Sequence, residues 1–259
     1  MKTAILAGGK GVRFGAETQA LPKALIPVAG KPVVRRVMDI YAAQGFNEFV
    51  IALGHRGLDI KRHFVEAMQL DGNIKLDLRN RTIVSPPGPL DNWQIELVDT
   101  GQDTATGGRV GRLADHVDGD RFMLTWCDGL SDIDVEALLA FHRSHGKVAT
   151  LTAVNRKARF GYLTLDGASV ARFDEKPLRE EDWINGAFFV LERRIFDYID
   201  GDHCDWETAV LQRLVADGEL MAYRHRGFWQ AMDTPADRDA LEQAMKAGLL
   251  EGNNTGDGK

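Results

Sequence analysis

The sequence predicts an α/β fold in which a mostly parallel β-sheet is flanked by helices. Short apolar runs rich in strand-forming residues alternate with segments of helical periodicity over roughly the first 155 residues. The chain has 259 residues, of which 44% are hydrophobic and 27% are charged, an ordinary composition for a globular protein. Together these observations predict a single domain over residues 1–250 and a flexible polar tail at 251–259.

The elements of the first half follow one another in a regular order. Thr3–Leu6 is an apolar strand that leads directly into a glycine-rich loop. Pro32 suits the first turn of a helix, which carries apolar residues up to Tyr41 and ends near Gly45. Further strands are expected over Glu48–Leu53, Phe122–Trp126 and Val148–Val154, and further helices over Leu58–Met68 and Val135–His145.

The second half is less regular but keeps both kinds of element. Strands are expected over Gly161–Leu165, Val170–Asp174, Ile184–Val190 and Leu220–Tyr223, and helices near Arg193–Ile199 and Glu207–Asp217. Thr234, Pro235 and Asp237 form the start signal of a last helix that should run to about Lys246. The prolines of Ser85–Pro89 indicate an exposed loop rather than a linker. We therefore expect a core at 1–155 and a substrate-facing lobe at 156–250 within one domain.

Charge and cysteine content restrict the classes of function. The net charge of −6 argues against a general binder of nucleic acid or of anionic membranes. No apolar stretch approaches the roughly 18 residues of a membrane helix, and the N-terminus lacks the apolar region of a signal peptide. The two cysteines, Cys127 and Cys204, are too few for a disulfide framework or a zinc cluster. A cytoplasmic protein is the simplest interpretation.

The first 36 residues are basic, although the whole chain is acidic. This segment holds a single acid, Glu17, against the bases Lys2, Lys10, Arg13, Lys23, Lys31, Arg35 and Arg36. Because glycines are interleaved with these bases, the pattern favours a local anion site. A solvated basic face is the alternative.

The segment Leu6–Phe14 carries the strongest local signal. Glycines after a strand let backbone N–H groups converge on an anion without obstruction by Cβ atoms. Arg13 and Lys23 would add charge to the same polyphosphate. A Walker-type loop is excluded because Gly9-Lys10 is followed by glycine, and a dinucleotide fingerprint is excluded because Phe14 stands at its third glycine position.

Two aspartates are candidate ligands of a metal ion. Asp128 follows an apolar strand, at the sheet edge where ligands of open α/β folds bind, and Asp233 directly precedes a helix start. Mg²⁺ usually takes one or two protein carboxylates together with water and phosphate oxygens. From position alone, Asp128 could equally be a turn residue and Asp233 could assist a helix cap.

Taken in order, these motifs resemble the sugar nucleotidyltransferases, in which a Gly-Gly-x-Gly-x-Arg loop is followed about ten residues on by a Pro-Lys pair. More narrowly, the chain resembles the cytidylyltransferase branch that uses glucose-1-phosphate, from Met1 to roughly Lys246. The landmarks include Gly30-Lys31-Pro32, Thr106-Gly107-Gly108-Arg109, Cys127-Asp128-Gly129, Glu175-Lys176-Pro177, Ile184-Asn185-Gly186 and Met232-Asp233-Thr234. The resemblance implies a Rossmann-like mixed sheet with a smaller β-rich sugar-binding lobe, the nucleotide-diphospho-sugar transferase type.

The resemblance also implies a reaction and the residues that carry it. The family transfers a nucleotidyl group, here CMP from CTP, to a sugar-1-phosphate with Mg²⁺ as cofactor, and its members form homo-oligomers. The catalytic positions are Arg13, Lys23 and Asp128, and the metal ligands are Asp128 and Asp233. Nucleotide contacts fall on Leu6, Ala7, Gly8, Gly9, Gly11, Arg13, Lys23, Thr104, Arg109 and Cys127. Within this set, Thr104 and Arg109 match the positions that read the base. Sugar-phosphate contacts fall on Glu175, Lys176, Asn185 and Gly186.

Other readings stay open at this point. Val12, Trp126 and Cys127 depart from the cytidylyltransferase pattern near the nucleotide, so UTP, dTTP or GTP, or a modified sugar phosphate, is the first alternative. A non-catalytic sensor of nucleotide sugars is the second alternative, although it would not need both metal carboxylates and Lys23. A nicotinamide dehydrogenase is the third, and the failed fingerprint argues against it.

Overall fold

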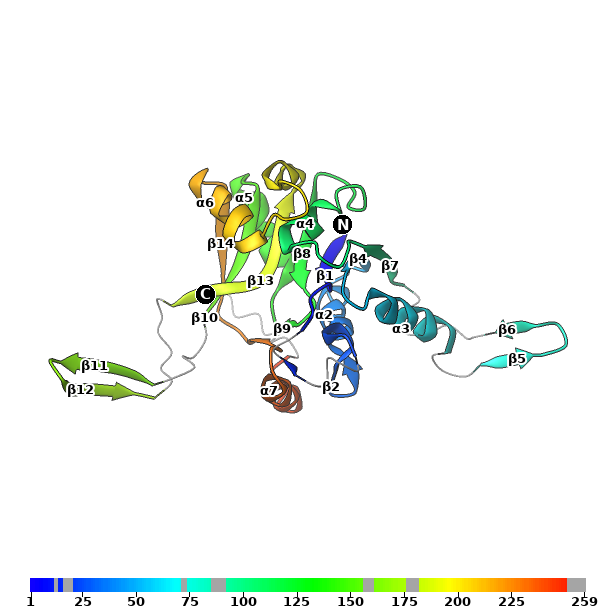
Figure 1. Cartoon of the computed structure of the whole chain (residues 1–259), viewed down its shortest axis with the longest axis horizontal. Coiled ribbons are helices and arrows are strands. Elements are labelled where there is room, and N and C mark those ends of the chain that lie inside the picture. The colour runs from blue at the N-terminus through cyan, green and yellow to red at the C-terminus, as the bar shows by residue number, and fades with distance from the viewer. Residues whose placement is uncertain are drawn as a thin grey trace.

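A seven-stranded sheet forms the centre of the computed structural model, which describes residues 1–11, 14–15, 21–70, 74–84, 92–155, 161–175 and 182–250. The strand order is β14-β10-β13-β8-β1-β4-β7 (Figure 1). Of the described strands in this sheet, only β13 runs antiparallel to its neighbours. The bounds are β1 Thr3–Leu6, β4 Glu48–Leu53, β7 Gln94–Asp99, β8 Arg121–Trp126, β10 Ala149–Asn155, β13 Trp183–Glu192 and β14 Leu220–His225.

Helices and short two-stranded ribbons connect these strands. The helices are η2 Lys23–Leu25, α2 Val33–Ala42, α3 Gly57–Leu70, α4 Thr106–Gly111, α5 Val135–His145, η3 Arg193–Tyr198, η4 Trp206–Val210, α6 Leu211–Ala216 and α7 Pro235–Lys246. Small ribbons pair β2 Pro27–Val28 with β3 Lys31–Pro32, and β9 Gly129–Ser131 with β15 Trp229–Ala231. None of the described helices is long and apolar enough to cross a membrane.

The strand order reverses direction at β1. The chain passes from β1 to β4 and β7 on one side, whereas β8 pairs with β1 on the other side. Leu6, at the carboxyl end of β1, is in register with Trp126, at the carboxyl end of β8. In open α/β sheets, ligands bind at such a switch point, beyond the carboxyl ends of the strands.

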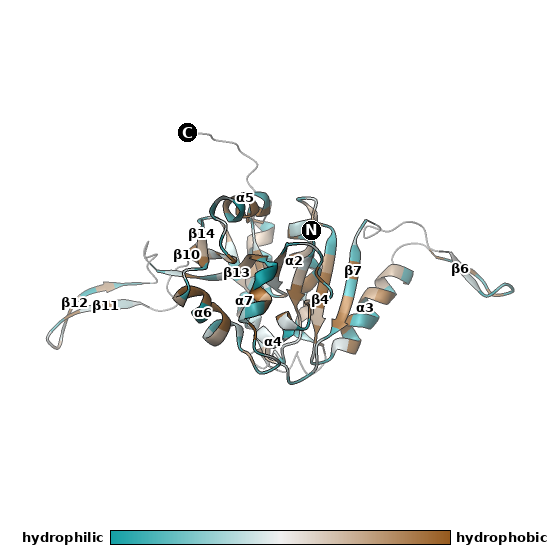
Figure 2. Ribbon diagram, turned by 90° about the horizontal axis from the view of Figure 1, so that it is seen from above, coloured by the Kyte–Doolittle hydropathy of each residue, from teal (hydrophilic) through white to brown (hydrophobic). Residues whose placement is uncertain are grey.

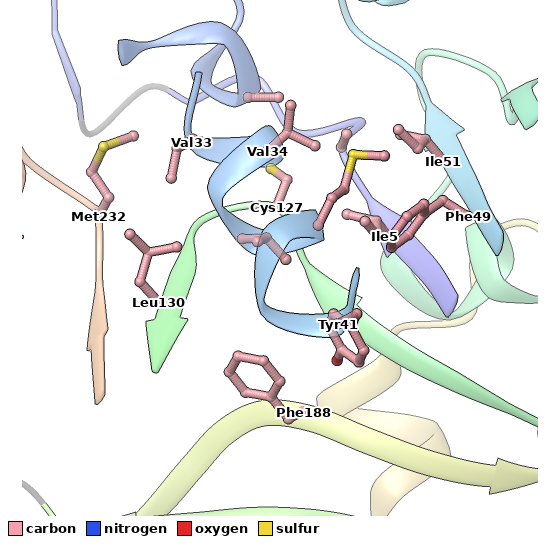
Figure 3. Packing of buried hydrophobic residues seen from close by; sticks show 14 of the residues in the cluster. Ile5, Val33, Val34, Tyr41, Phe49, Ile51, Cys127, Leu130, Phe188 and Met232 are labelled. Atoms are coloured by element: carbon pink, nitrogen blue, oxygen red, sulfur yellow. The ribbon is translucent and has the colours of Figure 1, made fainter. Parts of the chain in front are cut away.

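The core is divided between the two faces of the sheet. Alternate residues of a strand point to opposite faces, and in β1 Ile5 joins one buried cluster while Ala4 and Leu6 join the other. The first cluster contains α2 and parts of α5 and α7, and Figure 3 shows Val34 and Tyr41 of α2 packed against the sheet. The second cluster contains α4, η4 and α6, with Trp206 fully buried.

Two β-hairpins extend away from opposite ends of this body. One pairs β11 Tyr162–Asp166 with β12 Ser169–Asp174, and the other pairs β5 Lys75–Asp77 with β6 Thr82–Val84. Figures 1 and 2 show both hairpins reaching beyond the helices and the central sheet. Several of their apolar side chains are exposed, including Leu78, Leu163 and Phe173.

The predicted fold class is confirmed. The predicted strand Glu48–Leu53 and helix Val135–His145 have the predicted bounds, and the last helix begins at the predicted capping box. The predicted helix near Arg193–Ile199 is a 3-10 helix, and the one near Glu207–Asp217 begins one residue earlier as a π-helix. The strand β7 and the short helix α4 were not predicted. Ser85–Pro89 and the tail at 251–259 lie outside the described residues.

Strands from both sides of residue 155 share the central sheet. β10 precedes this position, while β13 and β14 follow it, and β10 lies between them. Within the expected lobe, the β11–β12 hairpin is the part that leaves the body. The division at residue 155 stays a prediction.

Candidate active site

The β9–β15 ribbon brings the two candidate metal ligands together. Gly129 of β9 is in register with Ala231 of β15, so Asp128 and Asp233 lie at the same end of this ribbon. The backbone N–H of Met232 donates to the carbonyl oxygen of Asp128 at 2.9 Å, which extends the pairing to this end. Antiparallel pairing thus explains how residues 105 positions apart come to face each other, since 233 − 128 = 105.

Lys23 lies between these two carboxylates. Its ammonium donates to Asp128, and it lies 2.9 Å from Oδ1 of Asp233. The Lys23 side chain is 13% exposed. Burial alone would lower the pKa of Lys23, but attraction to Asp128 and the bonds to both carboxylates outweigh it and raise the pKa above its ordinary value. Lys23 is therefore firmly cationic at neutral pH.

The pair of carboxylates fits a hard divalent cation. Asp128 and Asp233 both direct oxygen atoms at one ammonium group, so they already converge on a position that suits a positive charge. Among the described residues there is no group of three or more His, Cys, Asp and Glu side chains that could hold a metal. Two carboxylates with no further protein ligand are typical of Mg²⁺ bound together with substrate phosphates.

The glycine-rich loop packs on a buried arginine. The Arg109 guanidinium donates through Nη1 to the carbonyl oxygens of Leu53 and Gly101 at 3.2 and 2.6 Å. Nη1 also donates to Thr100 Oγ1 at 2.9 Å, and Nη2 donates to the Gln102 carbonyl at 3.1 Å. A Cβ atom on Gly8 would lie 2.6 Å from the guanidinium carbon, so a larger residue there would force Arg109 out of this position.

The arrangement of Arg109 bears on its predicted role. The donors described above are directed at the segment 100–102 and at the end of β4. Arg109 thereby fixes the loop that follows β7, whereas the family resemblance implies that its guanidinium contacts the base directly. A direct base contact by Arg109 stays a prediction, and its contacts identify it first as a residue that positions this loop.

A cavity of about 490 Å³ joins most of the predicted residues. It is lined by the predicted residues Leu6, Ala7, Gly8, Gly9, Gly11, Lys23, Thr104, Arg109, Cys127, Asp128 and Asp233. Seven further residues line it without having been predicted: Lys10, Ala24, Gln102, Ala105, Thr106, Trp126 and Asp205. Lys10 and Thr106 stand inside motifs visible in the sequence, whereas nothing local indicated Asp205.

Cys127 lines this cavity as an inert group. Its backbone N–H donates to the Leu6 carbonyl at 3.2 Å, which joins the ends of β8 and β1. Burial, together with the neighbouring charge of Asp128, raises the pKa of the Cys127 thiol to about 12. A thiol that stays protonated is a poor nucleophile and metal ligand, so Cys127 contributes shape.

Among the predicted sugar-phosphate residues that the structure describes, Glu175, Asn185 and Gly186 do not line this cavity. Asn185 and Gly186 are on β13, and the Gly186 carbonyl accepts a 2.8 Å hydrogen bond from the indole of Trp229 on β15. This bond ties β13 to β15, the strand that leads to Asp233. Glu175 lies at the base of the β11–β12 hairpin. Arg13 and Lys176 lie outside the described residues.

A larger hollow of about 980 Å³ lies elsewhere. Its walls come from α2, the segment after β9 and the end of α7, and they include Asp39, Asp132 and Glu136. It contains none of the predicted site residues, and its charged walls are mainly acidic. An anionic polyphosphate is disfavoured there, so the smaller cavity at the switch point is the candidate site.

Comparison with known proteins agrees with this geometry. The family profile described as Nucleotidyl transferase matches residues 2–246. The glucose-1-phosphate cytidylyltransferases of Salmonella typhi and Salmonella typhimurium are each 39% identical to this chain over 249 residues, which cover 96% of this chain and 97% of theirs. The resemblance inferred from the motifs is confirmed.

A solved structure supports the fold independently of close sequence identity. HddC from Yersinia pseudotuberculosis superposes with a TM-score of 0.69 at 18% identity, and the match covers 94% of this chain and 99% of that one. Profile, relatives and fold agree along nearly the whole chain. The protein therefore belongs to the family of nucleotidyl transferases that act on sugar-1-phosphates.

Proposed function

We propose that this protein transfers a cytidylyl group from CTP to glucose-1-phosphate and releases pyrophosphate. An oxygen of the sugar phosphate forms a bond to the α-phosphorus of CTP, and the bond from that phosphorus to the bridging oxygen of pyrophosphate breaks. The observation that carries the proposal is the convergence of Lys23, Asp128 and Asp233 beside the glycine loop. The names of the Salmonella relatives support the choice of CTP and glucose-1-phosphate.

The backbone of the opening loop would hold the phosphates. Gly8, Gly9 and Gly11 line the cavity and present main chain without side-chain obstruction, and Leu6 and Ala7 line it as well. A Cβ on Gly9 would meet no atom within 4 Å, so its surroundings leave room for a ligand. Arg13 would hold the pyrophosphate end, as the family motif implies.

Lys23 would stabilise charge at the reacting phosphorus. Attack adds negative charge to oxygens that are already anionic, so a fixed cation contributes directly to lowering the barrier. The sugar phosphate is already ionised, so its attack requires no general base.

A divalent metal is used by this family, and Mg²⁺ is the ion we propose. Asp128 and Asp233 would hold it, with phosphate oxygens and water completing its coordination. When bound, the ion neutralises polyphosphate charge and helps to orient the leaving group. In the free protein Lys23 pairs with the same two carboxylates, so the lysine and the ion would have to share them.

The remaining predicted contacts belong to the base and the sugar. Thr104 lines the cavity, and Arg109 would act on the base through the loop that it holds. Glu175 and Asn185 would bind sugar hydroxyls beside Gly186, and Lys176 would bind the sugar phosphate. Under this proposal the nucleotide-binding core is 1–155 and the sugar-binding lobe is 156–250. We also propose a homo-oligomer in the cytoplasm, where nucleoside triphosphates are made and used.

A panel of substrates tests the proposal directly. Glucose-1-phosphate and other sugar-1-phosphates are each combined with CTP, UTP, dTTP and GTP in the presence of Mg²⁺, and pyrophosphate release is measured. We expect CTP with glucose-1-phosphate to give the highest kcat/KM. A clear preference for UTP or dTTP would refute the cytidylyl assignment, and the absence of release with every pair would refute the reaction.

A variant separates catalysis from binding. Lys23→Ala should lower kcat by about 10²- to 10³-fold, the loss typical of removing one group that stabilises charge in a transition state. Lys31→Ala is the matched control, because Lys31 pairs with Asp39 on α2 and does not line the cavity. Retained turnover in a folded Lys23→Ala protein would remove Lys23 from this role.

A further inference from the structure

One acidic side chain reaches the cavity from a distant part of the chain. Asp205 precedes η4 and lines the cavity together with Thr104 and Thr106, which precede it by about 100 positions. We propose that Asp205 selects the base, because its carboxylate accepts a hydrogen bond from the amino group of cytosine and repels the carbonyl oxygen that uracil and thymine carry at the same ring position. This inference rests on the proposed nucleotidyl transfer and identifies Asp205 as the residue that makes the enzyme prefer CTP over UTP and dTTP.

Close backbone packing holds Asp205 at this position. The N–H of Ala105 donates to the Asp202 carbonyl at 2.8 Å, and the N–H of Gly108 donates to the Cys204 carbonyl at 3.0 Å. A Cβ on Gly107 would lie 2.8 Å from the Cys204 carbonyl oxygen, so glycine is what allows the two segments to meet. Asp205 is thus fixed relative to the loop predicted to surround the base.

One oxygen of the Asp205 carboxylate is strongly engaged and the other is not. Oδ1 accepts from the backbone N–H of Thr208 at 2.8 Å and from its hydroxyl at 2.7 Å. Oδ2 has a long contact of 3.4 Å with the Thr106 hydroxyl, and the backbone of Glu207 also bonds to the carboxylate. The bonds from the backbone and side chain of Thr208 lower the pKa of Asp205. The carboxylate is therefore ionised, with Oδ2 able to accept from a ligand.

The position of Asp205 corresponds to the base end of a bound nucleotide. Ala24, next to Lys23, and Met232, next to Asp233, belong to the buried cluster on the first face of the sheet. Val110 of α4 and Cys204 belong to the cluster on the second face. The cavity therefore runs from the cation and metal carboxylates toward the segment 104–106 and Asp205. A triphosphate at the first end leaves the second end for the base.

The chemistry of the bases makes a carboxylate a selective partner. Cytosine presents an amino donor where uracil and thymine present a carbonyl acceptor, and carboxylates are known partners of the cytosine amino group. Two acceptors that face each other without a proton between them repel, and each also loses part of its hydration on contact. An acidic residue in this place thus favours CTP by attraction and disfavours UTP and dTTP by repulsion.

Steady-state kinetics with Asp205→Asn test the proposal. Asparagine caps a helix as well as aspartate does, so the start of η4 is retained while the charge is removed. The ratio of kcat/KM for CTP to that for UTP, with glucose-1-phosphate as acceptor, should fall by about 10- to 100-fold. We expect the change mainly in KM for the two nucleotides, because the base is remote from the reacting phosphorus.

A matched control and two different negative results separate the role of Asp205 from the proposed reaction. Asp200 lies in the same loop, pairs with Arg213 and does not line the cavity. The Asp200→Asn variant should therefore keep the wild-type ratio of kcat/KM for CTP to that for UTP. An unchanged ratio in an active Asp205→Asn enzyme would overturn the inference. Absence of pyrophosphate release by the wild type with every nucleotide would instead overturn the proposed function. Asp205→Ser, which also caps, replaces the asparagine variant if that one does not fold.

Discussion

Lys23 balances two carboxylates that otherwise face each other across the cavity. Lys23→Met should lower the free energy of unfolding by about 2 kcal/mol without metal, since loss of one partner leaves partly buried charges unpaired. Added Mg²⁺ should recover most of the lost stability by binding the two unpaired carboxylates. Thermal unfolding with and without MgCl₂ measures both effects.

The wild-type protein and Lys31→Met provide the comparison for this prediction. Lys31 pairs with Asp39 at 2.7 Å in a more exposed setting, so its removal should cost little stability and should leave the response to magnesium equal to that of the wild type. An equal magnesium response in both variants would contradict the assignment of Asp128 and Asp233 to the metal.

Single residues also mark what the sequence could and could not predict about the site. The loop glycines, Lys23, Asp128 and Asp233 belong to motifs, and the cavity brings them together. Asp205 could not be found in this way, because its role depends on packing between segments about 100 positions apart. The engagement of Arg109 with backbone carbonyls is likewise a tertiary contact that residue type does not predict.

At the scale of elements, the start of α7 fixes one half of the proposed metal site. The Thr234 hydroxyl accepts from the Asp237 backbone N–H at 3.2 Å. The Asp237 carboxylate accepts in return from the backbone N–H groups of Asp233 and Thr234 at 3.2 and 2.9 Å. Thr234→Ala should therefore cost about 1 kcal/mol of stability. It should also raise the Mg²⁺ concentration for half-maximal rate by about tenfold, as loss of a supporting contact does.

A second helix start supplies the control for this prediction. Asp134 caps α5 through a 2.8 Å bond from the N–H of Ala137, and Asp134 does not line the cavity. Asp134→Ala should lose similar stability with no change in the magnesium requirement. If both variants needed the same raised Mg²⁺ concentration for half-maximal rate, the effect would come from lost stability and not from the position of Asp233.

The packing of α5 on the sheet depends on a buried histidine. The His142 side chain is fully buried, and its ring nitrogens lie 2.8 Å from Thr150 Oγ1 and 3.1 Å from Glu192 Oε1. Burial lowers the pKa of His142 more than the charge of Glu192 raises it. His142 thus stays neutral in the folded protein at pH values where the unfolded chain is protonated.

This difference makes stability fall as the pH falls. His142 contributes fully above its ordinary pKa of 6.5, and the contribution is lost as the pH drops from there toward its lower folded pKa. The slope is at most about 1.4 kcal/mol per pH unit for one such group. Denaturant unfolding between about pH 8 and pH 5 measures the slope. His142→Gln should reduce it, and an identical slope in the variant would contradict this account.

The elements differ in how far local sequence determines them. The helix over Val135–His145 has an N-cap, an apolar stripe and a terminal glycine, so its prediction succeeded. α4 contains Gly107 and Gly108, which are poor helix formers, and the helix exists because these glycines allow close packing against Cys204 and Asp202. The three-residue strands β9 and β15 likewise exist only through their pairing.

At the scale of the whole molecule, strand order creates the site. The reversal at β1 opens a crevice between β1 and β8, and the β9–β15 ribbon then brings Asp233 to its edge. The alternation of strands and helices predicted a parallel sheet, but it could not give the order of strands or the antiparallel insertion of β13. Those features depend on which apolar faces pack together, and the local sequence pattern of a strand does not determine its neighbours in the sheet.

The β11–β12 hairpin packs incompletely against the rest of the molecule. Leu163 is opposite Phe173 and Leu165 is opposite Val170, so one face of the hairpin is apolar. Their exposed fractions are 55%, 60%, 60% and 53%, in the order named. An isolated two-stranded hairpin is only marginally stable in water. A second copy of the chain covering this face would stabilise it and would account for the proposed homo-oligomer.

Phe173→Ser should therefore shift the protein to a smaller species. The substitution removes a large apolar contact from the covered face, so analytical ultracentrifugation should show a lower average mass at the same protein concentration. Arg172→Ser is the control, because Arg172 is paired with Thr164 on the opposite face and should leave the mass unchanged. If the wild-type chain sediments as a monomer, or if Phe173→Ser keeps the wild-type mass, the hairpin does not mediate assembly.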